Sequence, residues 1–214
     1  MNQGDHAERA FDSAFELTGG ALCVDFTNTW GDRRRPESDR LHGYDDLLAF
    51  AAEAGGIDRG AVAALRRAAR RSPAQARAVM AGALRLRDAL YRLLAAEARG
   101  RRPAADDVEA VNGALAEALP YLRLSRRAGA YVWRWTPGED PLAAPLRPVA
   151  RSAADLLTSG DLARVRECDG ADCTWLFLDQ SRNRSRRWCS MEGCGNRAKA
   201  RRHYHRHREG PPRG

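Results

Sequence analysis

Several features that would place a protein in a familiar class are missing from these 214 residues. No uninterrupted apolar run approaches the ~20 residues that a membrane-spanning helix needs. The first residues carry Asp5, Glu8, Asp12 and Glu16 and no apolar stretch, which argues against a secretory signal peptide. Internal repeats and a phosphate-binding glycine loop of the usual spacing are also missing. We therefore expect a cytoplasmic protein that does not act at a membrane.

Lysine is nearly absent, because Lys199 is the only lysine among 36 basic residues. A chain so rich in arginine and alanine is typical of a GC-rich genome, so its arginine content alone is weak evidence of nucleic-acid binding. The distribution of charge says more. Residues 180–214 hold eleven basic and two acidic residues, a net charge of +9, whereas the preceding 179 residues have a net charge of −1. The sequence thus describes a nearly neutral body followed by a cationic tail.

The first 160 residues predict a mainly helical domain, and a hydrophobic content of 43% is sufficient for an ordinary core. The clearest helix begins at Ser72 and Pro73 and ends at Gly100, since serine caps helices, proline suits their first position and glycine stops them. A short buried strand is expected over 21–26 and a surface loop over 31–40. Further helices are expected over 45–54, 59–71, 105–119 and 149–159.

Residues 121–136 change to the two-residue period of a β-hairpin, with its turn at 127–129. Tyr131, Trp133 and Trp135 alternate along its second strand. We expect them to form a face packed on the helices. The alternatives are that they line a ligand pocket or a dimer surface.

Four of the five cysteines form a C-x4-C-x15-C-x4-C pattern: Cys168, Cys173, Cys189 and Cys194. Zinc takes four soft or borderline ligands in a tetrahedron, and cytosolic proteins keep their thiols reduced. Two disulfides or four unrelated core cysteines are the alternatives. Four protein ligands leave no position for a catalytic water, so the pattern predicts one structural Zn²⁺.

A strand-like run at 174–179 lies between the two cysteine pairs, and a basic helix is expected over 198–208. The order knuckle, hairpin, second pair and helix is typical of a treble-clef-like zinc finger. The predicted fold class is therefore mainly α with a small β-hairpin, with a helical N-terminal domain at 1–160 and a zinc finger at 165–209. Residues 210–214 are expected to form a disordered tail.

The arginines of this finger have two interpretations. Four thiolates on Zn²⁺ leave a charge of about −2, which nearby arginines partly neutralise. That compensation does not account for a net +9, and phosphate contacts explain the surplus better than a solvated charged helix does. The candidate nucleic-acid contacts are Arg182, Arg186, Arg187, Asn196, Arg197, Lys199, Arg201 and Arg202, with Arg206 and Arg208 continuing the basic helix. The run His203, His205 and His207 extends this surface as pH falls, or supplies alternate metal ligands.

The segments Trp175 to Asn183, Arg186 to Met191, and Cys194-Gly195-Asn196-Arg197 together resemble the CGNR zinc-finger family. Gly19 to Thr29 resembles the opening of the domain called ABATE, which usually precedes that finger. The resemblance covers nearly the whole chain. It implies a helical N-terminal domain, the four cysteines as zinc ligands, and a bacterial transcription regulator described as stress-induced. The two residues after the last ligand remain ambiguous: Asn196 bonds a thiolate, caps backbone or contacts adenine, and Arg197 suits guanine.

The leading hypothesis is a DNA-binding transcription regulator associated with the nucleoid. Its helical domain would sense a signal, including a small-molecule effector, or form a homodimer, because one finger is a short reader of sequence. An RNA-binding or protein-docking finger is one alternative. A small-molecule enzyme in the N-terminal domain is another, with Cys23 as a nucleophile and Asp25, Asn28 and His42 lining a pocket, although no nucleophile, base and orienting group form a recognisable set.

Overall fold

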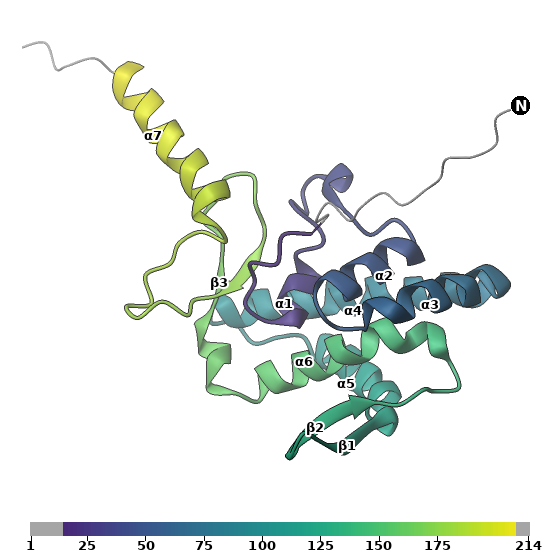
Figure 1. Cartoon of the computed structure of the whole chain (residues 1–214). Coiled ribbons are helices and arrows are strands. Elements are labelled where there is room, and N and C mark those ends of the chain that lie inside the picture. The colour runs from purple at the N-terminus through teal and green to yellow at the C-terminus, as the bar shows by residue number, and fades with distance from the viewer. Residues whose placement is uncertain (1–14, 209–214) are drawn as a thin grey trace, which may run out of the picture.

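The computed structural model describes residues 15–208, with side chains as far as Tyr204. Within the described residues six α-helices build the body, and α4 is the longest of them (Figure 1). They are α1 (Leu22–Thr27), α2 (Tyr44–Glu53), α3 (Arg59–Arg71), α4 (Pro73–Ala98), α5 (Ala105–Ala118) and α6 (Arg147–Leu157). The strands β1 (Leu122–Arg127) and β2 (Ala130–Trp135) form one antiparallel hairpin, and β3 (Val165–Glu167) and β4 (Leu176–Leu178) form another. The basic helix α7 (Asn196–Arg208) follows. The mainly helical fold with small hairpins is confirmed.

Local signals set some of the helix ends, although Ser72, which the sequence predicts as the cap of α4, makes no side-chain capping hydrogen bond. The Asp58 carboxylate accepts a hydrogen bond from the Gly60 N–H and caps α3. Gly100 adopts φ +63° just after α4, a left-handed conformation in which glycine is not strained. The predicted tail at 210–214 and the side chains of residues 205–208 lie outside the described residues.

The prediction of a strand over 21–26 was wrong, because this segment forms α1. A six-residue apolar run suits either structure, and the neighbours decide. The segment packs against α6, α4 and β4, so it is buried on several sides. Helical bonds satisfy its backbone: the Asp25 N–H donates to the Ala21 carbonyl, and the Thr27 hydroxyl donates to the Val24 carbonyl.

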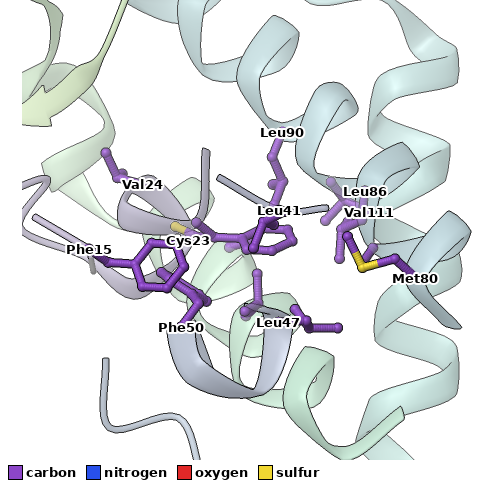
Figure 2. Close-up of a cluster of buried hydrophobic side chains, with 14 of the residues drawn as sticks. Phe15, Cys23, Val24, Leu41, Leu47, Phe50, Met80, Leu86, Leu90 and Val111 are labelled. Atoms are coloured by element: carbon purple, nitrogen blue, oxygen red, sulfur yellow. The ribbon is translucent and has the colours of Figure 1, made fainter. Parts of the chain in front are cut away.

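Figure 2 shows part of the hydrophobic core of the body, and the second hairpin contributes to the same core. Phe15 packs edge-on against Phe50, with ring centroids 5.5 Å apart. Three residues of the second hairpin, Val165, Leu176 and Leu178, belong to the same buried cluster. The start of the finger is therefore built into the body.

The hairpin of β1 and β2 differs from expectation in its packing. Its turn lies at Ala128 and Gly129, both with positive φ, as the sequence predicts. The aromatic face, however, is not covered by helices: Tyr131 is 69% exposed and Trp133 is 59% exposed. Only Trp135, near the base of the hairpin, is partly buried.

Candidate zinc centre and nucleic-acid interface

Four sulfur atoms converge at one end of the second hairpin. The Sγ atoms of Cys168, Cys173, Cys189 and Cys194 all lie within 4.8 Å of one another. The Cys173–Cys189 and Cys189–Cys194 separations are 3.8 and 3.7 Å. A tetrahedron with Zn–S bonds of about 2.3 Å has edges of about 3.8 Å, so the donor set fits zinc. All five cysteines are free thiols, which removes the disulfide alternative.

The local backbone is shaped to hold this cluster. The Cys168 N–H donates to the Trp175 carbonyl at 2.9 Å and closes the turn between the first two cysteines. The backbone N–H groups of Gly170 and Cys189 both point at Cys168 Sγ, at 3.4 Å. Hydrogen bonds from the Cys173 and Cys189 thiols, and then from these N–H groups, hold the pKa of Cys168 well below its usual range. A side chain at Gly170 would place a Cβ 2.9 Å from Cys194 Sγ, so this position needs glycine.

The order of elements in the finger differs from the expected one in a single respect. The strand between the cysteine pairs, β4, pairs backwards with β3 and not with a strand after it. The segment that follows is a loop, organised by the buried carboxylate of Asp179. That carboxylate accepts from the N–H groups of Ser181 and Arg186, both at 3.0 Å. Asp179 was not among the residues selected from the sequence, although an acid before a polar loop is the usual signal of such a turn.

Arg186 lies inside the finger. Its guanidinium stacks on Phe177 at 4.4 Å from the ring centroid. It donates to the backbone carbonyls of Trp188, Cys189 and Thr18, the last at 3.1 Å. It also donates to the Leu178 carbonyl at 3.4 Å. A guanidinium held by four carbonyls and a ring is committed to holding the finger on the body.

Asn28 joins the body to the finger. Its amide donates to the Leu176 carbonyl at 2.8 Å and accepts from the Leu176 N–H at 2.9 Å, so it serves as one residue of a partner strand for β4. Two further bonds cross the junction: the Leu178 N–H donates to the Gly19 carbonyl, and the Trp175 indole donates to the Trp30 carbonyl. Asn28 thus has a structural partner and does not line a pocket.

The loop 31–40 contacts both parts of the chain and is more than a surface loop. The Arg33 guanidinium bonds Asp88 at 2.8 Å and lies 3.9 Å from the Tyr91 ring centroid, which fixes the loop to α4. Its backbone N–H donates to the Thr174 hydroxyl of the finger. Arg87 of α4, which is almost fully buried, makes a bidentate bond to Asp39 of the same loop.

Helix α7 starts directly from the metal cluster through the π-helical turn Met191–Gly195. The Arg197 guanidinium donates to Cys194 Sγ at 2.9 Å, and the Cys194 thiolate raises the pKa of Arg197. Arg201 lies 4.0 Å from Asp172. Asn196, Lys199 and Arg202 are exposed.

The remaining candidates fall into two groups. Arg187 is paired with Asp169 at 2.7 Å, whereas Arg182 is exposed on the loop after β4. In the body, Cys23 is fully buried, and burial raises the pKa of its thiol to about 11. Asp25 accepts the Gly19 N–H, and His42 is exposed at a separate place. These body residues form no reactive constellation, so the geometry gives the enzyme alternative no support.

A helical body carrying a basic four-cysteine finger defines a protein of the zinc-finger class. Residues 20–160 match the model of the ABATE family, described as "Putative stress-induced transcription regulator", and residues 164–207 match the CGNR zinc finger. The chain therefore belongs to the ABATE family and carries a C-terminal CGNR zinc finger with one structural Zn²⁺. A search of curated proteins gave no match. The family description is that of a transcription regulator and not of an enzyme. Among the described residues, none of the helices has the length and apolarity that crossing a bilayer requires.

Proposed function

We propose that this protein is a DNA-binding transcription regulator in which the zinc cluster fixes helix α7 to the body, so that the outer face of α7 contacts duplex DNA. Cys168, Cys173, Cys189 and Cys194 would hold the ion. Zinc supplies a rigid cross-link between the body-anchored hairpin and the π-helical turn that starts α7. The observation that carries the proposal is the separation of charged groups on α7.

The two sides of α7 carry different groups. Arg197 and Arg201, four residues apart, reach toward Cys194 Sγ and Asp172, although Arg197 is also exposed and Arg201 is partly exposed. Asn196, Lys199 and Arg202, each three residues from the next, lie on the exposed side. The exposed side offers a lysine and an arginine for phosphate or guanine and an amide suited to adenine. DNA contact explains this pattern better than a uniformly solvated helix does.

The proposal reduces the number of residues that are expected to contact DNA directly. Arg182 joins the exposed side of α7 as a contact because it has no ion-pair partner among the described residues. Arg186, Arg187 and Arg197 hold the finger together through carbonyl, carboxylate and thiolate partners. Under the proposal, these three arginines attract DNA through their positive potential and do not contact base edges themselves.

The same geometry favours duplex DNA over RNA as the target of the finger. Sequence-specific RNA recognition stacks unpaired bases on exposed aromatic rings. Trp175 and Phe177 of the finger are buried in its small core, which leaves Tyr204 of α7, 58% exposed, as the exposed ring among the described residues of the finger. We further propose that the body, residues 1–160, receives the signal or forms a homodimer, since the finger at 165–209 is short for a single reader.

The test is binding of the zinc-loaded full chain to a mixed-sequence duplex, followed by fluorescence anisotropy between about 50 and about 200 mM salt. About six phosphate contacts should give a slope near −5 in log affinity against log salt. Lys199→Ala/Arg202→Ala should flatten that slope by about 2. Arg70→Ala/Arg71→Ala, which removes the same charge from the exposed end of α3, is the matched control. A wild-type slope near zero, or equal flattening by both pairs, would contradict the proposal.

A further inference from the structure

The first hairpin carries an aromatic surface with no role in the zinc finger. It lies at the lower edge of the molecule in Figure 1, away from α7 at the upper left. In its register Leu124 faces Trp133 and Arg126 faces Tyr131, so these four side chains share one face. Leu124 is 58% exposed, as are Trp133 and Tyr131 to a similar degree. A protein rarely leaves such rings in water without a partner for them.

The charge of this hairpin has a single sign. Arg123, Arg126, Arg127 and Arg134 lie between Leu122 and Trp135, with no acidic residue in that segment. None of the four makes an ion pair within the part of the chain whose side chains are described. The segment therefore carries +4 on a body whose total charge is nearly zero. That field attracts a polyanion and opposes the docking of a second, identical hairpin.

A hollow of about 450 Å³ adjoins the same face, between the hairpin and α6. Trp133 and Trp135 line one side, and Arg151 lines the other, with its guanidinium 5.0 Å from the Trp133 ring centroid. Two acids, Asp155 and Asp161, also line the hollow, and each has an arginine partner, Arg151 at 2.8 Å and Arg164 at 3.5 Å. The volume falls within the range of ligand pockets and admits a planar base.

We propose that this hairpin and hollow bind single-stranded nucleic acid, as a site separate from α7. Tyr131 and Trp133 are two residues apart on one strand, which spaces their rings by about 7 Å. They form a platform for two successive unpaired bases. Arg126, which has no ion-pair partner among the described residues, lies beside this platform to pair with phosphate. A duplex keeps its bases stacked inside and cannot use these rings, whereas a single strand can. The same chemistry serves DNA and RNA strands.

The experiment measures binding of the zinc-loaded full chain to fluorescein-labelled dT12 and U12 and to the mixed-sequence duplex. Trp133→Ala should weaken single-strand binding about tenfold, and Trp133→Phe should restore most of it, because a phenyl ring still stacks. Arg126→Ala should also weaken it and reduce its salt slope by about 0.7. Arg71→Ala, at the exposed end of α3, serves as the charge-matched control, and it should have little effect. Trp133 is more than half exposed, so its variants should fold, which circular dichroism checks.

The outcomes separate this proposal from the function proposed for α7. Lys199→Ala/Arg202→Ala should impair the duplex and spare dT12, and Trp133→Ala should do the reverse. Preference for U12 or for dT12 supports the proposal and identifies the strand. Failure of the wild-type protein to bind either strand overturns it, as does equal binding by Trp133→Ala. A dimer in sedimentation that Trp133→Ala dissociates would assign the face to a second copy instead.

Discussion

Replacement of Asn28 by alanine tests whether the finger is built into the body. Asn28 is buried, with 3% of its surface exposed. Its side-chain amide makes two hydrogen bonds to the Leu176 backbone, at 2.8 and 2.9 Å. Leu176 itself is fully buried. Alanine removes both partners and leaves a buried N–H and a buried carbonyl without a replacement in the protein.

The expected cost follows from those two orphaned groups. A buried polar group left unsatisfied costs about 1–3 kcal/mol, so with two such groups the free energy of unfolding should fall by about 2–6 kcal/mol. That is a large part of the roughly 5–15 kcal/mol that stabilises a typical domain. The midpoint of thermal unfolding should fall by about 4–24 °C for a chain of this size.

Urea denaturation of the zinc-saturated protein, followed by far-UV circular dichroism, measures this loss. Asn28→Asp retains an acceptor for the Leu176 N–H but sets an oxygen against its carbonyl, so it should be at least as damaging. Asn112→Ala removes the same side chain from an exposed position of α5 and should change stability by less than about 0.5 kcal/mol. A loss below about 1 kcal/mol for Asn28→Ala, or a loss equal to that of Asn112→Ala, would refute the argument.

Three further results are expected. Chelation of zinc should open residues 186–208 to trypsin while the helical body stays resistant, because α7 is attached mainly through the π-helical turn; mass spectrometry of the fragments shows which part is cut. Burial raises the pKa of Asp25 from 3.8 to about 6, so the folded state favours the neutral acid, and about 3 kcal/mol of stability present below pH 3.8 should be lost as pH rises to 6. Asp25→Asn should flatten that dependence in urea titrations at several pH values; an unchanged profile would exclude Asp25 as its source. Arg87→Met strips Asp39 of its bidentate partner and should cost about 3–5 kcal/mol, with partial recovery in Arg87→Met/Asp39→Asn.

Features fixed by local chemistry were predictable from the sequence. The helix expected at 59–71 matches α3, since its cap at Asp58 is a local bond. The turn was recoverable for the same reason, because Gly129 adopts positive φ without strain, although nothing in alanine itself indicates the positive φ of Ala128. The four-cysteine cluster also followed from spacing, since metal ligands impose a short and regular separation.

Features that depend on distant neighbours were not predictable. The segment 21–26 is apolar enough for a strand, and only its place among α4, α6 and β4 makes it helical. Alternation along β2 marks an aromatic face but does not say whether a helix covers it. Arg182 and Arg186 look equivalent in the sequence, yet one is exposed and the other is held by carbonyls on both sides of the body–finger junction.

The position of α7 relative to the body follows from a chain of contacts with one weak link. Leu176 and Leu178 sit in the body core, so β4 cannot move without disturbing it. The cysteines around β4 reach α7 mainly through the cluster with Cys189 and Cys194, supported at the surface by the ion pairs Arg187–Asp169 and Arg201–Asp172. Under the proposed function, a signal received by the body can redirect α7 in two ways: by shifting the loop 31–40, which touches both α4 and the finger, or by loosening the zinc. A shift of the loop 31–40 would change the orientation of α7 while the helix stays attached. Loss of the zinc would detach α7 from its position on the body. A regulator that must switch DNA contact on and off reversibly is therefore better served by the loop, because its ion pairs can exchange without dismantling the ligand shell.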